Sequence, residues 1–276
     1  DADMELGFDQ ICLYEENPVL PKGNDAGQVT LNETEKLFEI SGEYDGNSFV
    51  YSFGKKTGTF TQMKKNGKDI LVSPMEYNIF RAPTDNDRNI VHEWMRAGYD
   101  RSVTKIYKAE ATVLDGKAVI SVDMSISAIY IQKILRIHVV WTVTSDGQVS
   151  LCLDAHRDPS LPFLPRFGLK LELPASYQQA EYFGYGPYES YEDKHRASYM
   201  DKFESSVDNL HEDYIKPQEN GSHYHCFYVA LKGDNGMIRV CASKPFAFNA
   251  SNYTIKELAQ KAHNYELKKS DFVTLC

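Results

Sequence analysis

The chain has 276 residues, and its 30 basic and 39 acidic side chains give a formal net charge of −9. No apolar run approaches the roughly 20 residues that cross a bilayer, which argues against a membrane protein. The acidic balance, without a dense block of Lys and Arg, argues against a nucleic-acid binder, because phosphates are bound by cationic side chains. The five cysteines are scattered singly, so the sequence predicts neither a zinc knuckle nor a disulfide framework.

The N-terminal region has the pattern of a short strand followed by a linker. Residues 8–14 form the predicted strand, and residues 16–25 are rich in Pro, Gly, Asn and Asp. We therefore expect residues 1–24 to be the end of a preceding domain plus a linker, and residues 25–276 to form one domain. Both ends resemble cut ends, so we also expect an excised portion of a longer polypeptide, truncated at its C-terminal end.

The segments that follow have the pattern of strands joined by tight turns. Residues 49–53 and 57–61 flank Gly-Lys-Lys and predict a hairpin, and Asn66-Gly67 predicts a two-residue turn. Three longer strand-like runs then cover residues 109–114, 118–127 and 133–144.

The last of these runs shows the clearest alternation. In an extended segment, one face carries Leu135, Ile137, Val139 and Trp141, and the opposite face carries Ile134, Arg136, His138 and Val140. This period of two is typical of a half-buried antiparallel strand.

Two segments have a helical pattern instead. Residues 89–100 place Ile90, Trp94 and Met95 near one helical face, with Gly98 as the stop. Residues 251–263 predict a second helix, with Ser251 or Asn252 as its N-cap. The sequence therefore predicts an all-β fold, a large antiparallel β-sandwich with one or two short helices.

Several polar clusters are candidate sites, and each has a simpler structural interpretation. Residues 85–89 (D-N-D-R-N) match the first half of a calcium loop, but the required Gly and the bidentate Glu are missing. A polar turn closed by Asx-type hydrogen bonds is the commoner interpretation. The G-Y-G-P run at 184–187 lacks the third Gly of a dinucleotide site. His223 and His225 fall on one face of a predicted strand, although the sequence shows no third metal ligand.

Five short motifs then occur in a fixed order. They are R-A-P-T-D-N-D at residues 81–87, L-P-R-F-G at 164–168, Y-F-G-Y-G-P-Y-E-S-Y at 182–191, Y-I-K-P-Q-E-N-G at 214–221 and F-A-F-N-A-S at 246–251. Together they resemble the C-terminal, small-chain domain of family-two β-galactosidases. Ser190 departs from the family pattern, which has Asn at that position.

The resemblance implies a supersandwich, the galactose-mutarotase-like arrangement of large antiparallel sheets. It also implies a terminal domain or separate small subunit of a retaining enzyme that hydrolyses terminal β-D-galactosides. In that family the two catalytic glutamates lie in a barrel domain, and none of that barrel is in this chain. A mobile loop beside the active site corresponds to about residues 88–93, and a tryptophan that contacts the sugar falls after the position of Cys276.

The resemblance therefore implies no catalytic residue in this chain, but a wall of the substrate cleft. The wall residues would be Asp85, Asn86, Asp87, Arg88, Asn89 and Glu93. Other candidate polar sites are Arg81, Arg166, Glu189, Glu219, Asn220 and His223. We expect no metal or cofactor here, whereas the family often uses Mg or Na in its barrel domain. The expected partners are the barrel domain, a β-galactoside and further copies in a homo-oligomer, and no nucleic acid or membrane. The resemblance leaves the cytoplasm and periplasm of a bacterium open.

Two alternatives stand beside this interpretation. The domain is an autonomous carbohydrate-binding or aldose-epimerase-like module, with His156, Glu219 and His223 as candidate acid–base groups. Or the domain is structural, and its many Tyr and Phe side chains cover the barrel and build oligomer contacts.

Overall fold

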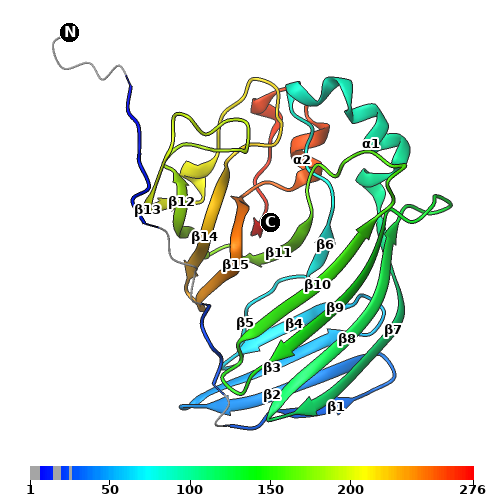
Figure 1. Ribbon diagram of the computed structural model, residues 1–276. Coiled ribbons are helices and arrows are strands. Elements are labelled where there is room, and N and C mark those ends of the chain that lie inside the picture. Colours follow the sequence, from blue (N-terminus) through cyan, green and yellow to red (C-terminus); the bar gives the residue numbers. More distant parts are fainter. Residues whose placement is uncertain (1–6, 15–19, 25–26) are drawn as a thin grey trace.

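The structure is a computed structural model that describes residues 7–14, 20–24 and 27–276. Two stacked antiparallel sheets form one half of the molecule. The first sheet has the order β1-β2-β3-β4-β5. Its strands are β1 (Thr30–Glu33), β2 (Leu37–Tyr44), β3 (Asn47–Gly54), β4 (Thr59–Lys65) and β5 (Lys68–Asp69). The second sheet has the order β10-β9-β8-β7. Its strands are β7 (Val103–Leu114), β8 (Lys117–Ser127), β9 (Leu135–Val143) and β10 (Val149–Arg157). The two sheets lie face to face in the lower part of Figure 1.

A third antiparallel sheet makes up the other half and has the order β13-β12-β14-β15-β16-β11-β6. Its strands are β6 (Glu76–Asn78), β11 (Gly168–Pro174), β12 (Gln179–Gly186), β13 (Tyr199–Ser206), β14 (Ser222–Gly233), β15 (Gly236–Ser251) and β16 (Phe272–Leu275). The described residues hold two α-helices, α1 (Val91–Ala97) and α2 (Ile255–Gln260). They also hold the 3₁₀ turns η1 (Asp85–Asn89), η2 (Tyr99–Arg101), η3 (Asp208–Leu210) and η4 (Asn264–Glu266). This confirms the predicted all-β sandwich with few helices.

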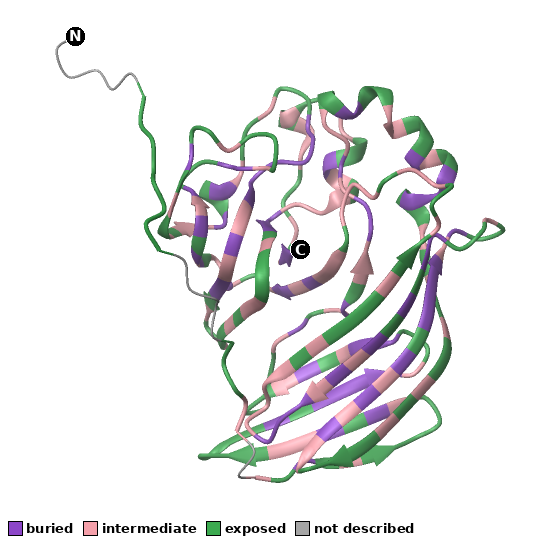
Figure 2. Ribbon diagram, viewed as in Figure 1, coloured by how far each residue is buried: buried purple, intermediate pink, exposed green. Residues whose placement is uncertain are grey.

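The core of the sandwich is aromatic. Trp141 of the second sheet meets Phe53 and Phe60 of the first sheet edge-on, with ring centroids 6.2 and 5.4 Å apart. Strand β9 alternates buried and accessible residues as predicted (Figure 2). Leu135, Ile137, Val139 and Trp141 are all buried. Burying a large apolar side chain stabilises a fold by about 1.5–3 kcal/mol, so these side chains hold the two sheets together.

The predicted turns are also present, because the residue types suit left-handed backbone. Asn66 and Gly67 both have positive φ angles in the β4–β5 hairpin, as do Asp115 and Gly116 between β7 and β8. Gly98 ends α1 with φ of 77°, as its position in the sequence predicts.

Two details of the sequence-based prediction are wrong. Residues 8–14 form no strand. They lie beside the edge strand β13, where the Gln10 side-chain amide, not the backbone, bonds the backbone of Met200 at 2.7 and 2.9 Å. The second helix is capped by Thr254 and not by Ser251 or Asn252, because Ser251 pairs with Thr274 in the sheet.

The predicted linker at residues 16–25 falls mostly outside the described residues, and the boundary at residue 25 stays a prediction. In the described part of the chain, no helix has the length and apolar character needed to span a membrane.

Candidate polar site at the D-N-D turn

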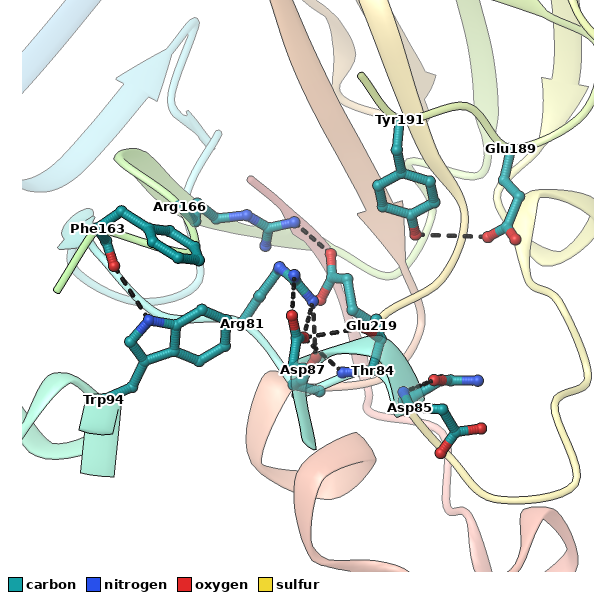
Figure 3. Close-up of polar contacts among 12 residues, drawn as sticks. Arg81, Thr84, Asp85, Asp87, Trp94, Phe163, Arg166, Glu189, Tyr191 and Glu219 are labelled. Atoms are coloured by element: carbon teal, nitrogen blue, oxygen red, sulfur yellow. Dashed lines mark hydrogen bonds and ion pairs between the residues drawn. The ribbon is translucent and has the colours of Figure 1, made fainter. Parts of the chain in front are cut away.

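The D-N-D motif folds into the 3₁₀ turn η1, which Asp87 closes from inside. The Asp87 carboxylate accepts bonds from the Thr84 backbone N–H at 2.7 Å and from the Thr84 hydroxyl at 3.0 Å. It also receives both guanidinium nitrogens of Arg81, at 2.7 and 3.0 Å (Figure 3). A capping box of this kind, with a bidentate arginine behind it, makes the turn rigid. Asp87 is therefore a buried positioning residue.

The other residues of the predicted cleft wall do reach solvent. Asp85, Asn86, Arg88 and Asn89 are exposed on η1, and Glu93 is exposed in the first turn of α1. The segment 88–93, which resembles the family's mobile loop, therefore forms the end of η1 and the start of α1. These five exposed residues, called the polar strip below, offer accessible carboxylate, amide and guanidinium groups.

Aromatic side chains pack against Arg81, the residue that pairs with Asp87 in the turn. The Arg81 guanidinium lies 5.7 Å from the ring centroid of Trp94, which is fully buried. Trp94 donates its indole N–H to the Phe163 carbonyl at 3.0 Å, and the two rings meet edge-on at 5.6 Å. Phe163 itself is 59% exposed, so the Trp94–Phe163 contact reaches the surface.

Arg166 and Glu219 form a buried ion pair behind the turn (Figure 3). Burial by itself lowers the pKa of Arg166, but the adjacent Glu219 carboxylate outweighs it and holds that pKa above its ordinary value. A buried charge of this kind depends on its partner, because the protein interior solvates it poorly.

Residues 218–221 connect this pair to the surroundings, and each contacts a different segment. The Gln218 side-chain oxygen accepts the Asp85 backbone N–H at 2.8 Å. Glu219 binds Arg166, and the Asn220 side-chain oxygen accepts the Glu212 backbone N–H at 3.1 Å. The motifs at 81–87, 164–168 and 214–221, remote in sequence, therefore meet in one place.

The same segment reaches the motif at 182–191 through its last residue. The Gly221 backbone N–H donates to the Glu189 carboxylate at 2.9 Å. Glu189 also accepts bonds from the Lys194 ammonium and the Tyr214 hydroxyl. Burial raises the pKa of the Glu189 carboxyl, but these three donors outweigh it and leave the pKa below its usual value. Glu189 is thus a buried, ionised and fully bonded group.

His223 is a packed core residue. Its ring lies 4.3 Å from the Tyr182 ring and 5.2 Å from the Phe248 ring. Burial lowers the pKa of His223 to about 4, so the ring is neutral near pH 7. A β-bulge between His223 and Cys226 and a positive φ at His225 break the alternation on which the predicted histidine pair depends. Among the described residues, no group of three or more His, Cys, Asp or Glu has a metal-binding arrangement.

The three acid–base candidates of the epimerase alternative occupy very different environments. His156 lies on β10 with its side chain 76% exposed. Glu219 forms an ion pair with Arg166, and the His223 ring packs against the rings of Tyr182 and Phe248. Nothing in these contacts unites them in one reactive group.

Sequence reasoning missed several residues that build this region. Lys194 lies in no recognised motif, and Phe163 gives no signal at all. Tyr214 and Gln218 lie inside the recognised motif at 214–221, but nothing in the sequence marks Tyr214 as a partner of Glu189.

The comparisons with known proteins agree with this convergence of motifs. A family model described as the β-galactosidase small chain matches residues 45–276. The chain belongs to the β-galactosidase small-chain family. The matched range holds the three motifs that meet at the turn and the motif at 182–191, which joins them through Gly221.

The curated relatives are β-galactosidases of bacteria. The chain is 42% identical to a β-galactosidase of Actinobacillus pleuropneumoniae, over 100% of this chain and 27% of that protein. It is 32% identical to one from Staphylococcus xylosus, over 98% of this chain and 27% of that protein. One from Streptococcus thermophilus is 28% identical over 88% of this chain and 24% of that protein. The chain thus spans about a quarter of the length of these relatives.

Proposed function

We propose that this chain is the non-catalytic terminal domain of a family-two, retaining β-galactosidase, and that it completes the active-site mouth. The catalytic glutamate pair lies in a barrel domain of the same polypeptide, which hydrolyses terminal β-D-galactosides. Residues 25–276 form the domain, and residues 1–24 join it to the preceding one. The assembled enzyme is a homo-oligomer.

The observation that carries the proposal is the rigid turn at Thr84–Asn89. Its buried carboxylate, Asp87, binds Arg81 and Thr84, and these bonds hold the turn in shape without any ligand. Its exposed groups, such as Asp85 and Asn89, are free of these roles and suit hydroxyl recognition. A preorganised polar strip of this kind positions a substrate well, because little entropy is lost on binding.

The state of the buried carboxylates supports a non-catalytic role. Asp87, Glu189 and Glu219 are each paired with a cationic side chain, namely Arg81, Lys194 and Arg166. Glycoside hydrolysis requires one carboxyl group that acts as an acid and a second that acts as a nucleophile or base. The pairing of these three carboxylates with cations supports a structural role for each of them in this domain.

Activity measurements test the proposal directly. The isolated 276-residue chain and the complete natural polypeptide that carries it are assayed on a chromogenic β-D-galactoside. We expect turnover from the complete polypeptide and none from the isolated chain. Circular dichroism of the isolated chain verifies its strand content. Robust turnover by the isolated chain, or a complete polypeptide that hydrolyses only other glycosides, would overturn the proposal.

A further inference from the structure

A small pocket opens at the other end of the 218–221 segment, beside Glu189. It has a volume of about 290 Å³. Pockets for drug-sized ligands begin at about 300 Å³, so this one suits a ligand of about one ring. Its lining includes Tyr188, Glu189, Lys194, Glu212, Asp213 and Tyr214.

The pocket combines aromatic and hydrogen-bonding groups. Tyr188 is 62% exposed, so one face of its ring is available at the mouth. At the base, the Glu189 side chain is 5% exposed and is fixed by Gly221, Lys194 and Tyr214. An aromatic ring offers a flat apolar surface, and the ammonium and carboxylates offer donors and acceptors to hydroxyl groups.

The pocket is formed before any ligand arrives, because its loop is anchored to the sheet. The Ser190 backbone N–H donates to the Ser222 carbonyl at 2.7 Å, and the Ser190 hydroxyl accepts the Tyr224 backbone N–H at 2.9 Å. Ser190, which departs from the family's Asn, therefore ties the loop to β14.

The charge of the lining selects the class of ligand. Glu189, Glu212 and Asp213 against Lys194 give a net charge of −2, which disfavours phosphates and sugar acids. The same net charge would attract a cation, but Lys194 already pairs with Glu189 and lies 5.7 Å from the Tyr214 ring centroid, so it occupies the buried carboxylate and the ring that a cation would use. The remaining class is a neutral ligand with one apolar face and several hydroxyls.

We propose that this pocket binds one pyranose ring of a neutral saccharide, stacked on Tyr188 and hydrogen-bonded to Lys194 and Asp213. The proposal does not depend on the catalytic role proposed above. It assigns the chain a sugar-binding site of its own at Glu189.

Hydrogen exchange measured by mass spectrometry on the complete natural polypeptide that carries residues 1–276 tests the proposal, because it reports on each peptide separately. The probe is methyl 1-thio-β-D-galactoside, whose thioglycosidic bond resists hydrolysis by the complete polypeptide, titrated through the millimolar range. We expect slower exchange in peptides from residues 186–198 and 210–215, by about twofold when the sugar concentration equals Kd. Trimethylamine N-oxide at equal concentration controls for general osmolyte stabilisation.

Two variants sharpen the result. Tyr188→Ala removes the stacking surface and should abolish the sugar-dependent slowing in both peptides. Tyr130→Ala, at a fully exposed tyrosine outside the pocket, should leave the slowing intact. Three results would overturn the proposal: no slowing across the titration, slowing that survives in Tyr188→Ala, or equal slowing by tetramethylammonium chloride.

Discussion

The carboxylate of Glu219 and the guanidinium of Arg166 form an ion pair in which the two side chains are 2% and 16% exposed. Arg166 precedes β11 and Glu219 precedes β14, and these strands are separated in the sheet by β15 and β16. The pair therefore fixes two chain segments that no backbone ladder joins directly. Gln218, the residue before Glu219, accepts the backbone N–H of Asp85 and so connects the D-N-D turn to this pair.

Removing one member of the pair should destabilise the protein strongly. Glu219→Gln leaves the Arg166 guanidinium buried without a counter-charge, and we expect the free energy of unfolding to fall by about 3–5 kcal/mol. The double variant Arg166→Met/Glu219→Leu should lose much less than the sum of the single changes. Urea denaturation at pH 7 measures both values. Lys64→Ala, at the exposed Lys64–Asp69 pair, is the control, and an equally small effect of Glu219→Gln would contradict the prediction.

Substitution of Asp87 should destabilise the protein, whereas the same substitution of Asp85 should not. Asp87→Asn replaces a charged acceptor of Arg81 and Thr84 in a side chain that is 10% exposed, and we expect a loss of about 1–3 kcal/mol. Asp85→Asn should change stability little, because its backbone N–H still reaches Gln218. The two denaturation midpoints give the comparison, and equal midpoints would refute the assignment of Asp87 as the group that closes the turn.

Exposed residues of the turn should affect substrate binding in the complete polypeptide. Asn89→Ala and Glu93→Ala remove single hydrogen-bonding groups, worth about 0.5–1.5 kcal/mol, so we expect KM to rise about two- to tenfold at similar kcat. Steady-state kinetics on a chromogenic β-galactoside measures the change. Glu110→Ala, at an exposed acid of β7, is the matched control. An unchanged KM in both turn variants would remove this strip from the cleft wall.

His223 should make stability depend on pH. Its pKa is lowered to about 4, from an ordinary value of 6.5, so the unfolded state binds more protons between these values. Its contribution is complete above pH 6.5 and declines as the pH falls toward 4, by about 3 kcal/mol in total. Urea midpoints between pH 4 and 7 should therefore fall less steeply in His223→Gln than in the wild type.

Part of the slope should persist in that variant, because burial also lowers the pKa of His211. His156→Gln, at a side chain that is 76% exposed, serves as the control and should keep the wild-type slope. Parallel pH profiles of wild type and His223→Gln would mean that His223 does not titrate across folding.

Two glycines provide a matched test of packing at the end of α1. Gly98 and Gly46 have φ angles of 77° and 72°, so alanine is strained by about 1–2 kcal/mol at either position. At Gly98 the new Cβ would also lie 2.4 Å from the Ala128 side chain, whereas at Gly46 nothing lies within 4 Å. Gly98→Ala should therefore lower the melting temperature clearly more than Gly46→Ala, and equal shifts would contradict this packing.

Much of the fold follows from local chemistry. The alternation in β9, the Asn66-Gly67 turn and the Gly98 stop were predicted correctly, because each depends on neighbours in sequence. The predictions that failed depend on contacts with segments distant in sequence. Residues 8–14 have strand-like alternation but meet β13 only through side chains, and Ser251 is held by β16 instead of starting a helix.

The sequence by itself determined the strand pattern, the tight turns and, through five ordered motifs, a resemblance to the β-galactosidase small chain that the family match confirms. Only the tertiary structure decided what the motif residues do. It separated buried Asp87 from exposed Asp85, joined Glu219 to Arg166, and gave Glu189 the partners Lys194 and Tyr214. The physical reason is that the free energy of a charged side chain depends on its burial and its partner. In a sheet protein those are supplied by segments far away along the chain.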